Sequence, residues 1–322
     1  GQGGADQFSA HEADILAQLA AIGAQDTPEL EGDGARCRLP RDLDELAALY
    51  AANPEARLLA GGTDLVLEIT QQHRRLPLTI HLGQVEELKT IVVDEAALDI
   101  GATVPLTDCA PLLAADYPDF GALLGRFAST QIRNQATLGG NLGNASPIGD
   151  GAPLLIALGA SLLLRQGQRR RMLPLEDFFL DYRVTALQPG EFIERILVPR
   201  PQPGQLFRAF KVSKRHDDDI SAVCAAVHLQ IDDGLVREAR IALGGMAAIP
   251  KRASQCEQAL LGHPWSETAV ERAASALEQD FDPLDDLRAS RTYRLRVAQN
   301  LLRKAWLETS QPDLPTRVTD HV

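Results

Sequence analysis

The sequence predicts an α+β protein, with small sheets and helical segments in separate stretches of the chain. Residues 76–106 alternate short β-branched runs with turns, as a small sheet does. Apolar and polar residues alternate in 223–231 and 239–243, and Asp233-Gly234 makes a hairpin turn between them. Helical periods follow in 250–261, 267–280 and 291–307. Residues 206–312 are therefore expected to form a separable α+β unit, followed by a frayed polar tail at 313–322.

The composition is that expected of a soluble globular protein with two or three domains. The 322 residues carry a formal charge of −12, with 45% apolar and 24% charged residues. No apolar run approaches the ~20 residues that span a bilayer, and the negative charge argues against nucleic acid as a general partner. The four cysteines contain no Cys-x-x-Cys pair, which excludes a zinc or iron–sulfur site built from adjacent ligands and favours reduced thiols in the cytoplasm.

Residues 1–35 are expected to be a linker with one docking helix. Apolar residues recur there at helical spacing between a glycine-rich start and a polar stretch: Ile15, Leu16, Leu19 and Ile22. The first residue is glycine rather than methionine, so we expect the chain to be a piece of a longer protein. From Arg36 a short strand leads into a helix that Asp42 caps and Pro54 ends.

An apolar strand, a Gly-Gly-Thr-Asp turn and a second apolar run make up residues 58–70. The turn places flexible backbone and a hydroxyl at the end of a strand, where a ligand can approach the main chain. A purely structural turn would also explain Gly61 and Gly62. Further along, His81 lies in a β run with no second His or Cys at ligand spacing, so a sheet histidine is favoured over a metal ligand.

Helical period returns at 107–124 and leads to a segment from Phe127 to Asp150 that is rich in glycine and asparagine. Such a loop suits a phosphate, because glycine admits positive φ and consecutive main-chain N–H groups form a nest for anions. The apolar helix expected at 152–158 would add its unpaired N–H groups. A solvent-exposed turn is the alternative for this segment taken alone. A Rossmann fingerprint is excluded, because G-x-G-x-x-G would need glycine in place of Leu138.

Two charged runs follow. Residues 160–175 read as two strands joined at Gln166-Gly167-Gln168, and the run Arg169 to Arg171 is either a docking patch for phosphate or protein or, as we favour, a solvated hairpin end. A strand at 206–212 carries Lys211 and precedes the dense cluster 214–219, for which an exposed loop is the default interpretation.

Taken together, these motifs resemble those of the FAD-binding flavoprotein module of the molybdenum hydroxylases. Three separated motifs occur in the family's order: AGGTDL at 60–65, TLGGNLGNASPIGD at 137–150 and FKVSKRHDDDI at 210–220. The resemblance covers the chain from about Arg36 to the C-terminal helix and is strongest to the small subunit of bacterial xanthine dehydrogenase. It implies an FAD-binding domain of the PCMH type at 36–205, with two α/β lobes at about 36–95 and 96–205. A C-terminal domain with a three-stranded antiparallel sheet and helices follows at 206–312.

The resemblance also implies which residues bind the cofactor. The main-chain N–H groups of one segment would wrap the FAD diphosphate: Leu58, Leu59, Ala60, Gly61, Gly62, Thr63, Asp64 and Leu65. A second set would close on it from the other side: Thr137, Gly139, Gly140, Asn141 and Asn144. Phe127 matches the aromatic residue beside the isoalloxazine ring, whereas Asp150, Glu194 and Lys211 match other cofactor-contacting positions. Relatives sometimes have Asn in place of Gly62. Lys211 and Asp218 are the candidates for tuning the flavin potential.

The function implied is electron relay in a xanthine dehydrogenase, an oxidoreductase. Electrons would arrive from iron–sulfur clusters, fed by molybdopterin on a large partner subunit, and leave as hydride to NAD⁺. The iron–sulfur clusters have no ligands here and are expected in a partner domain or chain, so a hetero-oligomer is expected. The first alternative is a flavoprotein subunit of a CO, aldehyde or nicotinate hydroxylase that delivers electrons to oxygen or quinone. A flavin-free assembly module is the second.

Overall fold

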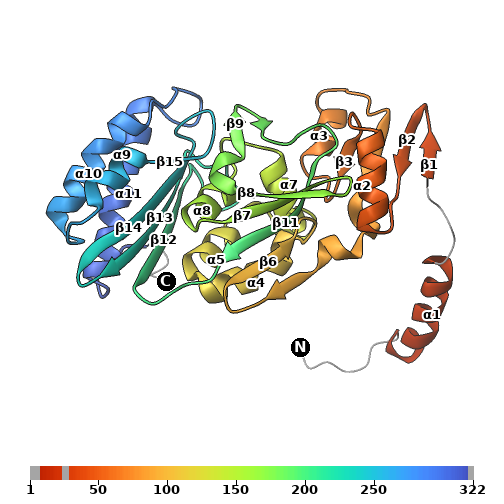
Figure 1. Cartoon of the computed structure of the whole chain (residues 1–322), viewed down its shortest axis with the longest axis horizontal. Coiled ribbons are helices and arrows are strands. Elements are labelled where there is room, and N and C mark those ends of the chain that lie inside the picture. The colour runs from red at the N-terminus through yellow and green to blue at the C-terminus, as the bar shows by residue number, and fades with distance from the viewer. Residues whose placement is uncertain (1–7, 24–28, 318–322) are drawn as a thin grey trace.

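The computed structural model describes residues 8–23 and 29–317. Two lobes and a C-terminal unit lie in a row, and the N-terminal helix stands apart from them (Figure 1). This helix, α1 (Glu12–Gly23), follows a 3₁₀ turn η1 (Ser9–His11). The helix is where the sequence predicts it, but it does not dock onto the described part of this chain. Its apolar residues Ile15, Leu16 and Leu19 are 41%, 58% and 57% exposed.

The first lobe has a four-stranded sheet in the order β1-β2-β4-β3. Strands β1 (Glu29–Gly32) and β2 (Ala35–Arg38) form a hairpin, and β3 (Arg57–Leu59) and β4 (Leu78–His81) pair in parallel. Helix α2 (Leu43–Ala52) links β2 to β3 and starts as predicted at Asp42, whose carboxylate accepts the Glu45 N–H at 2.8 Å. Helix α3 (Leu65–Thr70) follows β3, and His81 lies in β4 as predicted. The sheet begins at residue 29, ahead of the predicted boundary at 36, because Asp33 and Gly34 turn the chain back with positive φ.

The second lobe has a five-stranded sheet with every neighbouring pair antiparallel, in the order β5-β6-β11-β7-β8. Its strands are β5 (Ile91–Val93), β6 (Ala97–Gly101), β7 (Ser161–Gln166), β8 (Arg169–Pro174) and β11 (Phe192–Pro199). Its helices are α4 (Leu106–Asp116), α5 (Pro118–Gly125), α6 (Thr130–Arg133), α7 (Leu138–Gly143) and α8 (Gly151–Ala157). Short connections complete it: η2 (Leu82–Gln84), η3 (Glu86–Lys89), η4 (Leu175–Asp177), β9 (Phe179–Asp181) and β10 (Val184–Thr185). Both lobes contribute to one apolar core, so they are packed against each other.

The C-terminal unit places a sheet between helices. Strands β12 (Gln205–Val212), β13 (Val223–Asp232) and β14 (Leu235–Gly244) form the predicted antiparallel sheet, and β15 (Lys251–Arg252) adds a fourth, two-residue strand. A helix was expected over residues 250–261, but the structure has a short strand at 251–252 and the helix begins only at Ser254. The helices are α9 (Ser254–Leu260), α10 (Glu267–Asp280) and α11 (Arg291–Ser310).

Both faces of this sheet are buried. On β13, Val223, Ala225 and Val227 face α9–α11, whereas Cys224 and Ala226 belong to the core of the two lobes, where α8 packs on β13 and β14. The alternation seen in the sequence therefore separates two buried faces rather than one buried face from solvent.

The chain after α11 is held in place as far as residue 317. Arg317 Nη2 lies 2.9 Å from Asp119 of α5 and 2.7 Å from Glu308 of α11. Within the expected frayed tail, these ion pairs tie Arg317 back to the fold, while 318–322 lie outside the described residues. Among the described residues no helix has the length and apolarity to cross a membrane, and no cluster of three metal-ligating side chains occurs.

Candidate functional site

The turn after β3 presents unpaired main-chain donors. Gly62 has φ +75°, and α3 begins with bonds from Val66 N to Gly62 O and from Leu67 N to Asp64 O. In the described part of the chain, the N–H groups of Gly61, Gly62, Thr63 and Asp64 donate to no protein acceptor. Four successive amides without a partner make a nest that suits an anion such as a diphosphate. The first predicted segment therefore has the donors that its proposed role needs.

This turn lies directly against the second glycine-rich segment. A Cβ added to Gly61 would lie 1.6 Å from the carbonyl oxygen of Gln135. Only glycine fits there, because any side chain would overlap the main chain of the other lobe. The structure thus brings together the two segments that the sequence singles out.

The second segment uses its own amides differently. The N–H groups of Leu138 and Gly139 donate to Val104 O and Ala102 O, both at 3.0 Å. The Gly140 N–H donates to Thr137 Oγ1, also at 3.0 Å, which caps α7. The N–H groups of Asn141 and Asn144 donate to Thr137 O and Gly140 O, as helical hydrogen bonds of α7. Four of the five residues predicted here, Gly139, Gly140, Asn141 and Asn144, thus use their main-chain N–H groups within the fold, so the contribution of this segment would come from side chains such as Thr137, Asn141 and Asn144.

A buried ion pair joins the second lobe to the C-terminal unit. Lys211 Nζ on β12 lies 2.5 Å from Asp150 Oδ2 at the start of α8, and both side chains are 2% exposed. Ser221 completes the cluster, with its hydroxyl 2.5 Å from Asp150 Oδ1 and 3.1 Å from Lys211 Nζ. The sequence pointed to Asp150 and Lys211 separately, but nothing in it indicated Ser221.

The predicted aromatic position is tied to the loop that follows β12. Phe127 is half-buried, and its carbonyl accepts from Arg133 Nη1 at 2.7 Å. The neighbouring Arg126 donates from Nε to His216 O at 2.9 Å and from Nη1 to Lys211 O at 3.1 Å. Arg126 was missed in the sequence, because an arginine that binds carbonyl oxygens far along the chain leaves no local pattern.

The 214–219 loop is largely exposed, as expected. Asp219 closes it by accepting the N–H groups of Arg215 and Ile220 at 2.9 and 3.0 Å, and these bonds, that from Arg215 first, hold the pKa of Asp219 below its usual value. Asp218 has φ +57° and no hydrogen-bond or ion-pair partner among the described residues. Its carboxylate is therefore exposed and makes no ion pair among the described residues.

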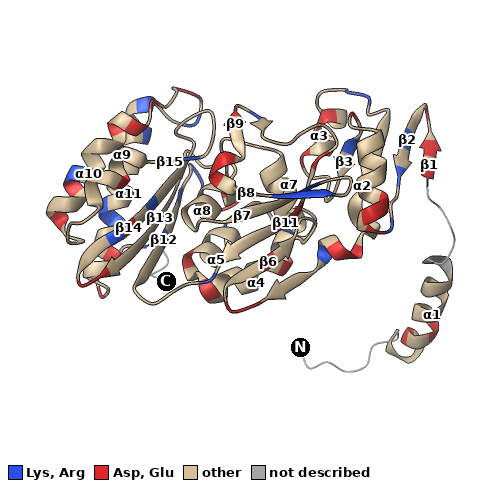
Figure 2. Ribbon diagram, viewed as in Figure 1, with Lys and Arg blue, Asp and Glu red and all other residues tan. Residues whose placement is uncertain are grey.

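Glu194 on β11 forms an ion pair with an arginine of β8, two strands away in the same sheet. Its carboxylate is buried and accepts Arg170 Nε at 2.8 Å, while Arg171 pairs with buried Glu191 at 2.7 Å. Figure 2 shows β8 as a basic strand along the edge of the second sheet. The arginine run is thus partly exposed, as favoured, but two of its members neutralise buried glutamates.

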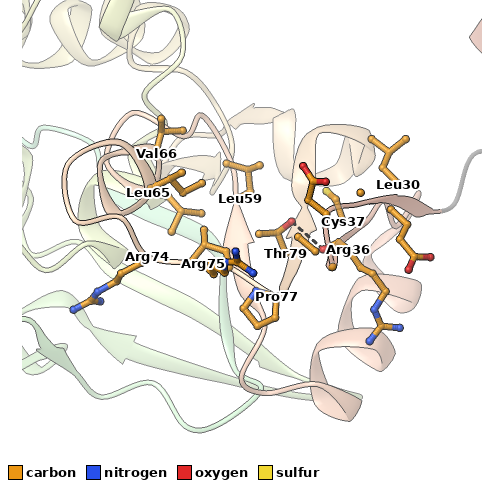
Figure 3. Close-up of a pocket in the computed structure, with 17 residues that line it drawn as sticks. Leu30, Arg36, Cys37, Leu59, Leu65, Val66, Arg74, Arg75, Pro77 and Thr79 are labelled. Atoms are coloured by element: carbon orange, nitrogen blue, oxygen red, sulfur yellow. Dashed lines mark hydrogen bonds between the residues drawn. The ribbon is translucent and has the colours of Figure 1, made fainter.

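A groove of about 960 Å³ opens in the first lobe beside the turn. Leu59, Leu65 and Val66 line one side, the loop with Arg74, Arg75 and Pro77 lies below, and β2 with Cys37 faces them (Figure 3). The sequence did not indicate this groove, because it forms only where α3 and the β1–β2 hairpin stand side by side.

Comparison with known proteins supports the family that the motifs indicated. Residues 33–201 match the model of the FAD binding domain in molybdopterin dehydrogenase, and residues 208–309 match the CO dehydrogenase flavoprotein C-terminal domain.

Curated relatives include a xanthine dehydrogenase of Emericella nidulans, 33% identical over 76% of this chain and 19% of its own length. A nicotinate hydroxylase of the same organism is 32% identical over 84% of this chain and 22% of its own length. The chain thus spans about a fifth of these relatives.

Solved structures agree with this assignment. A carbon monoxide dehydrogenase chain of Hydrogenophaga pseudoflava is 28% identical with a TM-score of 0.79, covering 85% of this chain and 96% of that chain. A quinoline 2-oxidoreductase chain of Pseudomonas putida 86 is 27% identical with a TM-score of 0.78, covering 88% and 99%. The fold, the two glycine-rich turns and both family matches agree, so the chain belongs to the FAD-binding domains of molybdopterin dehydrogenases and is the FAD-binding module of the molybdenum hydroxylase family.

Proposed function

We propose that this module serves a xanthine dehydrogenase, in which it takes electrons from iron–sulfur clusters and reduces NAD⁺. The choice of a xanthine dehydrogenase rests on the similarity to such enzymes, and the observation that carries the cofactor-binding part of the proposal is the meeting of three distant motifs. Gly61 lies against Gln135, Arg126 binds the loop after β12, and Lys211 pairs with Asp150. A cofactor bound at the unpaired amides of residues 61–64 would therefore lie close to side chains from every part of the module.

The chain's own residues would bind and orient the cofactor. The Gly61–Asp64 amides would hold the diphosphate without losing any protein hydrogen bond, since they have no acceptor among the described residues. The side chains of Thr137, Asn141 and Asn144 would complete that part of the site. Bound FAD would supply the one-electron and hydride chemistry, so the protein needs no nucleophile or proton-transfer pair.

Lys211 would act next to the flavin with most of its charge already balanced. Two of its N–H groups face Asp150 and Ser221, which leaves one without an acceptor among the described residues. That N–H would favour negative charge on the reduced ring and so raise the flavin potential. Asp150 limits the effect, because it holds a negative charge 2.5 Å from the ammonium group.

The other redox centres are proposed to lie outside this chain. The relatives are far longer, and this chain covers 19–22% of them. Iron–sulfur clusters and molybdopterin would belong to a partner domain or subunit, in a cytoplasmic hetero-oligomer.

A second candidate function keeps the cofactor and changes the reaction. Nicotinate hydroxylase and carbon monoxide dehydrogenase chains resemble this chain about as closely as xanthine dehydrogenases do. The alternative is therefore a module of such an enzyme, with oxygen or quinone as acceptor. A flavin-free assembly module is disfavoured, because the unpaired amides at 61–64 are retained.

Two measurements test these proposals. Titrating the purified chain with FAD should give a yellow, stoichiometric complex, whereas a colourless chain would support the assembly module. The full complex should then reduce NAD⁺ with xanthine. Turnover with nicotinate or carbon monoxide, or with oxygen or quinone in place of NAD⁺, would favour the second candidate.

The loop aspartates offer a separate test. Neutralising Asp218 removes a negative charge that has no protein partner among the described residues, so D218N should raise the flavin midpoint potential if the loop lies near the ring. D233N is a matched control, since Asp233 also has positive φ and lies in the distant β13–β14 turn. Identical redox titrations for D218N and wild type would remove the claim.

A further inference from the structure

The cluster of Asp150, Lys211 and Ser221 encloses one carboxylate completely. Lys211 donates to one oxygen of Asp150 and Ser221 to the other, each at 2.5 Å, and Ser221 is 1% exposed. The Cys224 thiol, 3.7 Å from the Asp150 carbonyl oxygen, borders the same space. No water-facing side remains to compensate for a lost partner.

The two donors come from opposite ends of one loop. Lys211 lies near the end of β12, and Ser221 stands just before β13, with residues 213–220 between them. The strands close behind them through the Ala222 N–H, which donates to Val212 O at 2.8 Å. Asp150 belongs to the second lobe, so a single carboxylate fixes both ends of this loop to the FAD-binding part of the module.

Ser221 has two effects on this arrangement. Its hydroxyl satisfies an oxygen of a buried carboxylate, which would otherwise lack a donor. It also accepts from Lys211 Nζ at 3.1 Å, so the ammonium group has two fixed acceptors and its third N–H keeps one direction. Without the Ser221 hydroxyl, the ammonium group of Lys211 would have Asp150 as its one acceptor in this cluster and could rotate about that contact.

We infer that Ser221 is a positioning residue, which aims the remaining N–H of Lys211 at the flavin and fixes the 213–220 loop. The inference rests on the proposed function, because it takes Lys211 to face the bound cofactor. It adds Ser221, which lies outside the three motifs. The neutral Ser221 hydroxyl would hold the Lys211–Asp150 ion pair, and that pair would tune the flavin midpoint potential.

The test compares S221A with wild type and with S213A in the full chain. Ser213 lies in the same loop, but its hydroxyl donates to Arg215 O at 2.6 Å and is outside the cluster. Without FAD, amide hydrogen exchange in 213–220 should be about tenfold faster in S221A, from the loss of a hydrogen bond to a charged group. With FAD bound, S221A should have a lower midpoint potential and about threefold weaker binding. S213A should match wild type in potential and affinity.

S221T keeps the hydroxyl and should restore the potential; if its extra methyl group prevents folding, S221C, a weak donor, should give an intermediate value. A wild-type potential in S221A would overturn the inference, even if loop exchange were faster, because the role would then be structural only. Unchanged exchange and unchanged potential would overturn both parts. If wild type bound no FAD, the proposed function would fail, while the exchange comparison would still decide whether Ser221 fixes the loop.

Discussion

The two glycine-rich segments look alike in the sequence, but their main-chain N–H groups are used differently. At 61–64 the main-chain N–H groups have no protein acceptor in the described chain, whereas at 138–144 most of them bond within the fold. Gly61 is required because the Gln135 carbonyl lies where a Cβ would be, and Gly139 because Ala102 O would lie 2.5 Å from one. The first segment therefore leaves four main-chain donors without a protein acceptor among the described residues, whereas the second uses most of its donors within the fold.

This difference separates two effects of mutation. Changes in the first segment should act mainly on cofactor affinity, because the amides themselves are displaced. Changes in the second should act mainly on stability, because they disturb packing between α7 and the preceding strand. The four experiments below test this division.

G61A should have the largest effect. Its Cβ would overlap Gln135 O, so the turn must move away and take the amide nest with it. We expect the FAD dissociation constant to rise by about 100-fold or more, which corresponds to ~2.7 kcal/mol. Isothermal titration with FAD measures this. Near-normal affinity would show that the nest is not the diphosphate site.

G139A should lower stability by about 1–3 kcal/mol, because an added methyl must displace the main chain at Ala102. Urea unfolding without FAD measures the change. G143A is the matched control in the same helix, because its Cβ would meet only Ile193 Cδ1 at 3.9 Å, an ordinary contact. It should be neutral or slightly stabilising, since alanine favours helix. Equal losses in the two variants would contradict the packing explanation.

G62A should weaken FAD binding by roughly 5- to 10-fold. Gly62 has φ +75°, and a non-glycine residue there costs about 1–2 kcal/mol, so the turn would relax away from the conformation that presents the amides. G62N should be milder, because asparagine tolerates this region better. The ratio of the two dissociation constants is the readout, and a larger loss in G62N would refute the backbone argument.

T137A should have the smallest effect, a loss of about 1 kcal/mol of stability from the missing cap on α7. T137S keeps the hydroxyl and should recover most of it. Thermal unfolding of the three proteins checks this. If T137A weakens FAD binding far more than stability, Thr137 contacts the cofactor directly, as the family resemblance implies.

Local sequence signals located the elements well. The helix starting after Asp42, the hairpin turn at Asp233-Gly234 and the helix at 267–280 follow from capping residues, turn residues and period, which act over a few positions. Two features were missed because each depends on a partner that is not adjacent in the chain. Strand β15 is only two residues long and forms by pairing with β14, and Arg317 is tied by an ion pair to Asp119 of α5.

The sequence alone identified the two glycine-rich segments and the three motifs, and the family resemblance that these motifs carry pointed to Asp150 and Lys211 as candidates. Folding determined which amides stay unpaired, that Ser221 joins Asp150 and Lys211, and that both faces of β13 are buried. The physical reason is the distance along the chain over which each interaction acts. Backbone conformation and period depend on neighbours in the chain, whereas the partner of a buried donor or carboxylate depends on which distant segments meet when the lobes pack together.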